Sequence, residues 1–289
     1  MVIEQAEMIA ALRKYEAQHK YDHGHALVLS GGVGRGGAAR LAARAALRVG
    51  AGLVTLGCPP AALSENAARL DAIMLRALRD GAQLRDMLTD TRITALCLGP
   101  GLGLGEGAAE LVATALEPDS TVARAIILDA DAVTHLAQNP GLQARLHPRC
   151  ILTPHAGEFA RLLPDLAEAL RTAPVEDQAA RAEIVQTGAA RLNAVLMLKG
   201  AVTVIAAPDG THAVSDARGA RAAPWLATAG SGDVLAGLVT GLAARGIAPQ
   251  QAAFWGALLH VEAARAFGPG LVADDLPDLL PAVLRDLGV

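Results

Sequence analysis

The segment 227–237 holds the residues of this chain that are best suited to chemistry. It reads Ala-Thr-Ala-Gly-Ser-Gly-Asp-Val-Leu-Ala-Gly, and the apolar residues that follow have helical spacing. Gly230 and Gly232 permit backbone conformations and close approaches that a Cβ atom would prevent. Unpaired N–H groups at the start of such a helix attract a phosphate or a developing oxyanion. A carboxylate at that point, Asp233, is electrostatically misplaced unless it transfers protons. A simpler interpretation is that Ser231 or Asp233 caps the helix.

Other polar and glycine residues follow the apolar segments that the pattern identifies as strands. Strands are predicted over 26–30, 53–56, 93–98, 125–128, 150–153, 194–198 and 202–206. The special residues after five of them are Gly31-Gly32, Gly99-Pro100-Gly101-Leu102-Gly103, Asp129-Ala130-Asp131, Pro154-His155 with Glu158, and Lys199-Gly200. Ligands of open α/β sheets bind outside the carboxyl ends of the strands. The sequence therefore predicts a composite site at one edge of a sheet.

Alanine-rich segments of helical length separate most of these strands. They cover 38–49, 108–116, 156–163, 174–192, 233–245 and 250–267, with a turn or helix near Leu279. Strands that alternate with helices indicate an α/β fold with a largely parallel central sheet covered by helices on both faces. The last two strands form either a hairpin or a short crossing. Glycines and prolines are spread along the chain, so a single domain over 1–289 is expected.

Composition excludes several classes of function. The 289 residues carry a formal net charge of −4, which leaves no electrostatic signature for binding nucleic acid. Cys58, Cys97 and Cys150 lie far apart and predict buried thiols, with neither a disulfide framework nor a zinc site. No signal-peptide pattern and no charge-free apolar run of about 18 residues is present. A cytoplasmic protein with no membrane or nucleic-acid partner is predicted.

Single motifs in this set are ambiguous. The residues 32–37 match GxGxxG, but Gly57-Cys58-Pro59-Pro60 follows the second strand without the acid that holds a ribose, which argues against an NAD-dependent dehydrogenase. The P-loop pattern GxxxxGK[ST] is absent. Asp129 and Asp131 either cap the next helix or hold hydrated Mg²⁺. His155 either orients a polar substrate or is structural, and Lys199 either binds phosphate or only extends from a strand end.

Taken together and in order, six segments resemble the ATP/ADP-dependent NAD(P)H-hydrate dehydratase family, which has the ribokinase-like fold. The segments are 37–54, 99–103, 128–132, 152–159, 198–205 and 226–235. The resemblance covers roughly residues 25 to 280. The family repairs NADH or NADPH that has taken up water across the C5–C6 bond of the reduced nicotinamide ring. The resemblance implies that a nucleotide phosphorylates the C6 hydroxyl of the S epimer and that phosphate is then eliminated.

The same resemblance implies roles for individual residues. Asp233 would accept the proton of the ring hydroxyl, beside an anion hole formed by the N–H groups of Gly230, Ser231, Gly232 and Asp233. Contacts to the hydrated cofactor are implied for Ala38, Gly103, His155 and Asp233. The adenine nucleotide would be bound by Lys199, Gly200, Ala201, Val202 and Thr203, with Gly232 against its phosphates. Mg²⁺ is expected with ADP or ATP, but no compact motif identifies its ligands.

The chain also departs from the family pattern. A GGS turn followed by an aromatic residue is replaced by Gly31-Gly32-Val33-Gly34-Arg35, and the Asn- and Gly-rich segment before the anion hole is replaced by residues 218–225. Many relatives carry an N-terminal epimerase domain. Because the first predicted strand begins near residue 26, that domain is not expected here, and a separate epimerase or spontaneous interconversion would supply the S epimer. A homo-oligomer, such as a tetramer, is a further implication of the resemblance.

Two other functions compete with this interpretation. A kinase of the same superfamily, acting on hydroxymethylpyrimidine or hydroxyethylthiazole, would use the same glycine turn and the same aspartate base. A catalytically silent nucleotide-binding module would need no carboxylate facing phosphates. The Thr-Pro-His-x-Gly-Glu segment at 153–158, combined with Lys-Gly-x-x-Thr at 199–203, favours the dehydratase.

Overall fold

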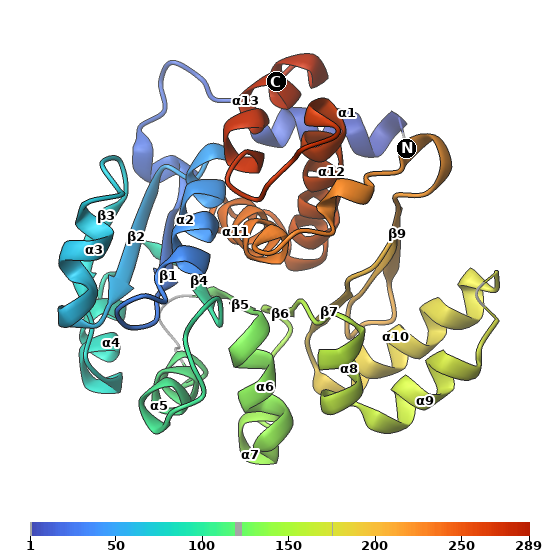
Figure 1. The fold of residues 1–289 in the computed structure, drawn as a ribbon, viewed down its shortest axis with the longest axis horizontal. Helices are drawn as coiled ribbons and strands as arrows, with labels where there is room; N and C mark the ends of the chain where they lie inside the picture. The colour runs from blue at the N-terminus through green and yellow to red at the C-terminus, as the bar shows by residue number, and fades with distance from the viewer. Residues whose placement is uncertain (1, 119–122, 175) are drawn as a thin grey trace.

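A computed structural model describes residues 2–118, 123–174 and 176–289. In these ranges one nine-stranded sheet crosses the molecule in the order β3-β2-β1-β4-β5-β6-β7-β8-β9 (Figure 1). The strands are β1 (His25–Leu29), β2 (Leu53–Cys58), β3 (Met74–Ala77), β4 (Ile93–Leu98), β5 (Ala125–Leu128), β6 (Cys150–Leu152), β7 (Val195–Leu198), β8 (Val202–Ala206) and β9 (His212–Asp216). Strands β1 to β7 are mutually parallel, whereas β8 is antiparallel to both of its neighbours.

Helices cover both faces of the sheet (Figure 1). On one face lie α1 (Val2–Leu12), α2 (Gly37–Arg48), α11 (Ser231–Ala244), α12 (Pro249–Phe267) and α13 (Leu276–Leu287). On the other face lie α4 (Gly81–Leu88), α5 (Glu106–Ala115), α6 (Ala130–Gln138), α7 (Pro140–Gln143), α8 (Ala156–Leu162), α9 (Pro164–Thr172) and α10 (Gln178–Leu192). The short α3 (Leu63–Ala67) precedes β3. The predicted α/β architecture, a largely parallel central sheet covered by helices on both faces, is confirmed.

Alternation along the central strands explains why the sheet can be covered twice. In β1, Ala26 and Val28 join the hydrophobic cluster under α2 and α11, whereas Leu27 and Leu29 join the opposite cluster. All five residues of this strand are buried. Successive side chains of a strand point to opposite faces, so a strand that is apolar throughout stabilises both helical layers.

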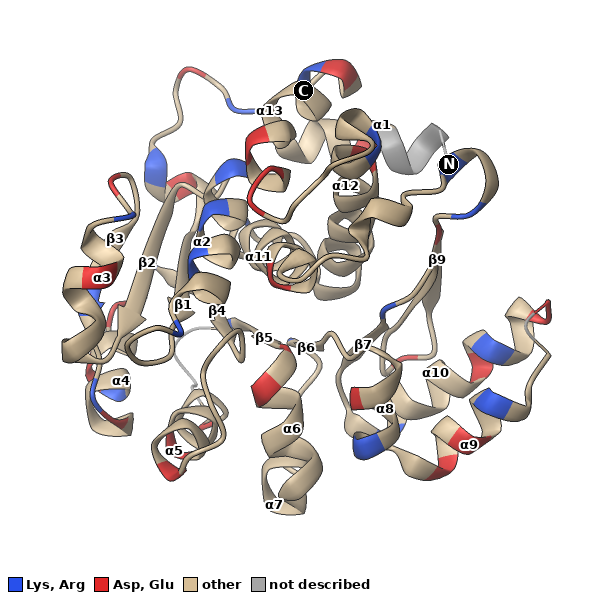
Figure 2. Ribbon diagram, viewed as in Figure 1, with Lys and Arg blue, Asp and Glu red and all other residues tan. Residues whose placement is uncertain are grey.

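The charged side chains lie outside these clusters. Lys and Arg are interspersed with Asp and Glu over the outer helices, as α9 and α10 illustrate (Figure 2). Arg191, for example, forms a two-point ion pair with Asp165, with both N–O distances at 2.8 Å. None of the helices in the described ranges combines the length and the apolar character that crossing a membrane requires.

Seven strands match the predicted ones within a residue or two, but the prediction was incomplete elsewhere. It did not include the two edge strands β3 and β9, which are short and only partly buried. The helix predicted over 174–192 begins later, as α10 at Gln178, and the preceding helix α9 was not predicted. Strands β7 and β8 form the hairpin that was one of the two alternatives.

The order of the strands reverses beside β1. The chain proceeds from β1 to β2 and β3 on one side, and then returns to place β4 on the other side. The loops after β1 and β4 touch, since a Cβ atom built on Gly31 would lie 1.9 Å from the carbonyl oxygen of Gly101. Open parallel sheets bind ligands at such a switch point, outside the carboxyl ends of the strands.

A tight crossing of α2 and α11 fixes the helix that begins at this edge. A Cβ atom on Gly237 would lie 2.2 Å from the carbonyl oxygen of Ala42, and one on Gly241 would lie 2.5 Å from that of Ala46. Only glycine therefore allows the two backbones to approach this closely. The crossing holds the first turn of α11 beside the first turn of α2.

We expect Gly237→Ala to lower the free energy of unfolding by about 3 kcal/mol, because the added methyl group meets backbone that cannot move without displacing α2. Urea denaturation measures the change. The matched control is Gly107→Ala in α5, where nothing lies within 4 Å of the added atom, and stability should stay the same or rise by up to about 1 kcal/mol. Equal effects of the two substitutions would contradict the close crossing.

Candidate active site

The first turn of α11 begins with a glycine whose conformation and surroundings exclude other residues. Gly230 is the N-cap and has a φ of 90°. A Cβ atom there would lie 2.8 Å from a methyl carbon of Leu41 and 2.9 Å from the Cβ of Ala273. Asp233 lies in the turn that follows. The first N–H groups of a helix have no acceptor within the helix, so this turn offers donors and a partial positive charge to an anion.

Asp233 has an altered proton affinity. Burial raises the pKa of its carboxyl from the ordinary 3.8 to about 6, and the negative charge of Asp129 acts in the same direction. The ammonium of Lys199 opposes this shift, whereas Asp131 and Glu158 add to it. A carboxylate with a pKa near 6 is ionised at neutral pH and still accepts a proton readily. The geometry thus supports the proton-transfer interpretation of this residue.

A buried ion pair lies beside this carboxylate. The Nζ atom of Lys199 is 2.7 Å from Oδ1 of Asp129, which also accepts a hydrogen bond of 2.7 Å from the hydroxyl of Thr153. Asp129 is 2% exposed, so its charge requires these partners. A Cβ atom on Gly232 would lie 3.4 Å from the same Nζ atom. Lys199 therefore reaches from the end of β7 to the first turn of α11, with Asp129 as its anchor.

The acidic pair after β5 does not cap α6, although capping was one alternative. Asp129 occupies the N-cap position without a capping hydrogen bond, and Asp131 accepts one of 2.8 Å from the N–H of Gly103. Ala130 between them has a φ of 44°, a conformation that is rare for a residue with a Cβ atom. Strain of this kind persists where the surroundings impose it, and it accompanies functional sites.

His155 is held in one orientation by the helix that it begins. Its Nδ1 atom accepts hydrogen bonds from the N–H groups of Gly157 (2.9 Å) and Glu158 (3.4 Å). The carboxylate of Glu158 in turn accepts a 2.9 Å bond from the N–H of His155. Because Nδ1 is an acceptor, the ring proton of the neutral imidazole resides on Nε2. His155 is structural in this capping role, and its exposed ring also faces the cavity described next.

A cavity of about 790 Å³ opens beside the first turn of α11. Its volume lies within the range of small-molecule sites. Four of the five residues predicted to bind the nucleotide line it, namely Lys199, Gly200, Ala201 and Thr203, whereas Val202 does not. Ser231, Gly232 and His155 line it as well. Apolar walls come from α12 and from the turn Pro224–Leu226.

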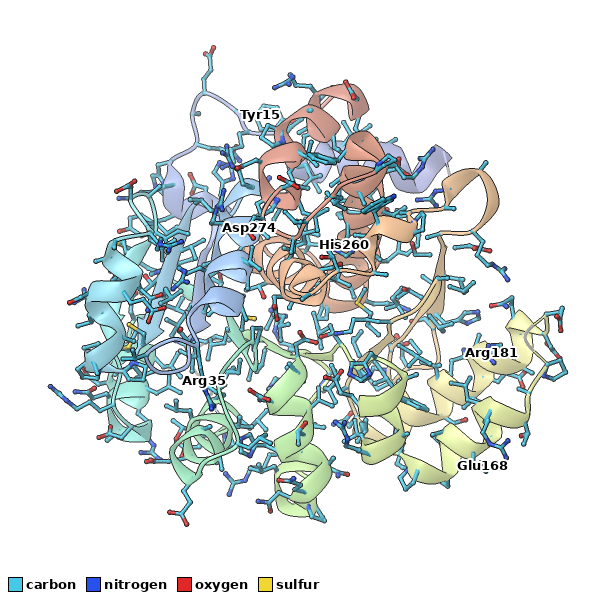
Figure 3. The ribbon with its side chains drawn as sticks, viewed as in Figure 1. Tyr15, Arg35, Glu168, Arg181, His260 and Asp274 are labelled. Carbon is cyan, nitrogen blue, oxygen red and sulfur yellow. The ribbon has the colours of Figure 1, made fainter. Side chains whose placement is uncertain are left out.

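Of the residues expected to contact the hydrated cofactor, Ala38 and Gly103 lie at the switch point, outside this cavity, whereas His155 lines the cavity itself. A Cβ atom on Gly101 would lie 3.6 Å from the Cβ of Ala38, so the start of α2 touches the loop that contains Gly103. The side chain of Arg35 extends along the same loop (Figure 3), and its guanidinium lies 3.4 Å from a Cβ atom built on Gly103. Asp131 binds the N–H of Gly103 and connects this loop electrostatically to Asp233.

Sequence reasoning missed His260. This α12 residue is buried beside α11 (Figure 3), and its Nε2 atom is 3.2 Å from the hydroxyl of Ser231. Burial lowers the pKa of His260 to about 4, so the ring is neutral at physiological pH. The pair fixes the Ser231 side chain at the wall of the cavity. The one clue to this contact in the sequence is that a histidine stands within an otherwise apolar helical segment.

The carboxylates of the site are not arranged as a metal cage. Across the described residues, no group of three or more His, Cys, Asp or Glu side chains is placed to hold a metal ion. Asp129 and Asp131 are already engaged by Lys199 and Gly103. Mg²⁺ usually keeps several waters and binds through one or two carboxylates together with phosphates. The site therefore fits Mg²⁺ that enters with a nucleotide, and not a resident ion held by protein alone.

Comparison with known proteins gives consistent matches. The family model described as NAD(P)H-hydrate dehydratase matches residues 26–281. A bifunctional NAD(P)H-hydrate repair enzyme of Moorella thermoacetica is 40% identical over 95% of this chain, which spans about half (52%) of that relative. An ADP-dependent (S)-NAD(P)H-hydrate dehydratase of Xanthomonas campestris is 33% identical, with 93% of this chain and 90% of the relative covered.

A solved structure agrees with these sequence matches. The ADP/ATP-dependent NAD(P)H-hydrate dehydratase of Bacillus subtilis, co-crystallised with ATP and Mg²⁺, superposes with a TM-score of 0.77 at 30% identity. The match covers 98% of this chain and 97% of that one. The likeness thus extends over the sheet and both helical layers.

We expect Asp233→Asn to stabilise the protein near pH 8 and to have no such effect near pH 4. The folded-state pKa of about 6 lies above the ordinary 3.8, so the stability of the wild type falls as the pH rises from about 4 to 6, and above 6 the full cost of the ionised Asp233 remains. Asparagine avoids this cost, which is up to about 3 kcal/mol. Thermal melting at the two pH values measures the difference.

Asp129→Asn is the matched control for this experiment. It leaves the buried ammonium of Lys199 without its carboxylate and should destabilise the protein at pH 8. If Asp233→Asn were the less stable protein at pH 8, or if its effect were equal at both pH values, the electrostatic description of Asp233 would be wrong.

Proposed function

The chain belongs to the NAD(P)H-hydrate dehydratase family, and we propose that it uses ADP or ATP to dehydrate the S epimer of hydrated NADH or NADPH. The observation that carries this proposal is the position of Asp233. Its carboxylate, with a pKa near 6, belongs to the first turn of α11, whose Ser231 and Gly232 line a nucleotide-sized cavity. It also interacts electrostatically with Asp131, which binds the loop of Gly103 at the switch point.

The adenine nucleotide occupies the cavity of about 790 Å³. The turn from Lys199 to Thr203 forms one wall and is fixed internally, because the Thr203 hydroxyl donates to the carbonyl of Gly200 at 3.0 Å. The apolar walls suit a base, and Gly232 lets phosphates approach the first turn of α11. Lys199 places one positive charge beside these phosphates.

The hydrated nicotinamide ring occupies the switch point, where the start of α2 with Ala38 touches the loop that contains Gly103. Its C6 hydroxyl then faces Asp233 from the side opposite to the nucleotide. The imidazole of His155 is held by its cap to α8, with Nε2 3.4 Å from Oε1 of Glu158, and it would contact the substrate from the side of the nucleotide cavity that it lines. Both polyanionic ligands thus meet at one carboxylate, which converts an encounter of two molecules into a reaction within one complex.

The chemistry has two stages. The oxygen of the C6 hydroxyl attacks the terminal phosphorus of the nucleotide, and Asp233 accepts the proton of that hydroxyl. The bond between this phosphorus and the oxygen of the departing AMP or ADP breaks. The leaving group at C6 is now phosphate instead of hydroxide, and phosphate leaves far more readily. The lone pair of the ring nitrogen then expels phosphate from C6, and loss of the C5 proton to water restores the C5–C6 double bond. The N–H groups from Gly230 to Asp233 stabilise the charge on the transferred phosphoryl group, although that of Ser231 also donates to the carbonyl of Thr228 at 3.4 Å.

Mg²⁺ bound with the nucleotide would neutralise charge on the transferring phosphates. The protein itself contributes the positive charge of Lys199, which its hydrogen bond to Asp129 holds in position. Epimerisation of the R hydrate by a separate epimerase or by spontaneous interconversion, and assembly of the chain into a homo-oligomer, are further parts of this proposal.

Incubation with chemically hydrated NADH and ADP or ATP tests the function. We expect the absorbance band of reduced nicotinamide to recover, with one phosphate released for each molecule repaired. Asp233→Asn should slow this recovery by roughly 10³-fold, a typical contribution of general base catalysis, while nucleotide binding persists. The control Asp71→Asn, an exposed carboxylate before β3, should be fully active.

Two results would overturn the proposal. A stable phosphorylated product without recovery of the band would identify a small-molecule kinase of this fold. Nucleotide binding without any turnover would identify a silent binding module. Unchanged activity of Asp233→Asn would leave the reaction in place but would remove Asp233 as its base.

A further inference from the structure

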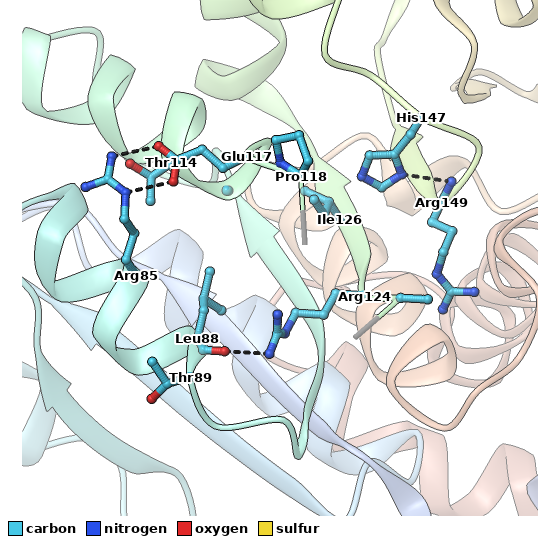
Figure 4. A pocket seen from close by; sticks show the side chains of 12 residues that line it. Arg85, Leu88, Thr89, Thr114, Glu117, Pro118, Arg124, Ile126, His147 and Arg149 are labelled. Atoms are coloured by element: carbon cyan, nitrogen blue, oxygen red, sulfur yellow. Dashed lines mark hydrogen bonds and ion pairs between the residues drawn. The ribbon is translucent and has the colours of Figure 1, made fainter. Parts of the chain in front are cut away.

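A second pocket lies at the opposite edge of the sheet from the candidate active site. It has a volume of about 520 Å³ and is formed where β4, β5 and β6 begin (Figure 4). Arg124 directly precedes β5 and Arg149 directly precedes β6, while the last turns of α4 and α5 close the sides. The parallel strands begin at this pocket and end at the candidate active site, so the length of a strand separates the two cavities.

The described residues that line this pocket carry three guanidinium groups and a single carboxylate. Arg85 and Glu117 neutralise each other through a two-point ion pair with both distances at 2.7 Å (Figure 4). Arg124 is buried and held in place by carbonyl oxygens, because its Nε donates to Ile93 at 2.8 Å and one Nη donates to Leu88 at 2.6 Å. These hydrogen bonds and the ion pair fix the described walls of the pocket.

Arg149 provides the signal that the pocket receives a ligand. Its Nε–H is buried without a hydrogen-bond partner, and within the described ranges its guanidinium forms no ion pair. A buried donor left in this state costs free energy, which an acceptor placed against the Arg149 guanidinium would remove. The guanidinium fork matches the oxygens of a phosphate in two-point geometry.

His147 adds a second donor to the same wall. Its Nδ1 atom accepts the N–H of Arg149 at 3.3 Å, so the ring proton lies on Nε2 (Figure 4). Burial lowers the pKa of this imidazole, and the charge of Arg149 acts in the same direction. The side chain is therefore a neutral donor beside a cation, which suits an acceptor-rich anion and disfavours a cationic ligand.

We propose that this pocket binds a phosphorylated small molecule, with Arg149 as the residue that holds the phosphate. The volume matches a phosphorylated metabolite and exceeds what a single phosphate ion would fill. The site lies apart from Asp233 and from the cavity beside α11, so the proposal does not depend on the dehydratase reaction.

Calorimetric titration with pyrophosphate tests the proposal on the full chain. We expect wild-type protein to show a binding event that weakens at least about tenfold in Arg149→Gln, the loss of one charged two-point contact. Arg149→Lys, which keeps the charge but loses the fork, should bind with intermediate affinity. The matched control is Arg145→Gln, a neighbouring exposed arginine that does not line the pocket, and it should bind as the wild type does.

Lys199→Gln separates this pocket from the candidate active site. The event sensitive to Arg149 should persist in Lys199→Gln, and melting curves verify that each variant is folded. Absence of any binding, equal affinity in Arg149→Gln and the wild type, or loss of binding only in Lys199→Gln would each overturn the proposal.

Discussion

The proposed site depends on one electrostatic conflict, a carboxylate that must stay ionised among other carboxylates and beside the phosphates of the proposed nucleotide. Asp233 lies near Asp129, Asp131 and Glu158, and burial further disfavours its charge. Two features limit the conflict without removing it. The first turn of α11 supplies partial positive charge, and Lys199 supplies a full one that a buried partner fixes in position. Burial and the neighbouring carboxylates together still raise the pKa of Asp233 to about 6, which suits the proton acceptor that we propose.

The fold makes this conflict possible by bringing distant segments to one edge. The loops after β1 and β4 meet at the switch point, and the segments after β5, β6 and β7 continue the row. Gly237 lets the backbones of α2 and α11 touch, and this close crossing positions Asp233 beside the loops at the carboxyl ends of the strands. The helix packing therefore affects the proposed reaction, because a change in this crossing would move the N–H groups of the first turn of α11 relative to the proposed nucleotide and the proposed hydrated cofactor.

Much of this arrangement follows from patterns within short segments. Apolar strands with polar residues at their carboxyl ends predicted both the sheet and the edge that carries the site. The strands β3 and β9 escaped prediction because edge strands need only one partner and little burial, which leaves weak patterns.

Tertiary contacts were the part that the sequence could not supply. The Lys199–Asp129 pair joins residues 70 positions apart, and His260 gains its role only from contact with Ser231. The pocket at the opposite edge leaves no local motif, because Arg149 precedes a strand like many surface arginines.

The most direct test of the central claim is a carbon-13 NMR titration of the Asp233 carboxyl, with its signal assigned by its absence in Asp233→Asn. We expect a midpoint near 6, and turnover that rises with pH through the same value. A midpoint at or below the ordinary 3.8, with turnover independent of pH in this range, would contradict the role of Asp233 as the proton acceptor.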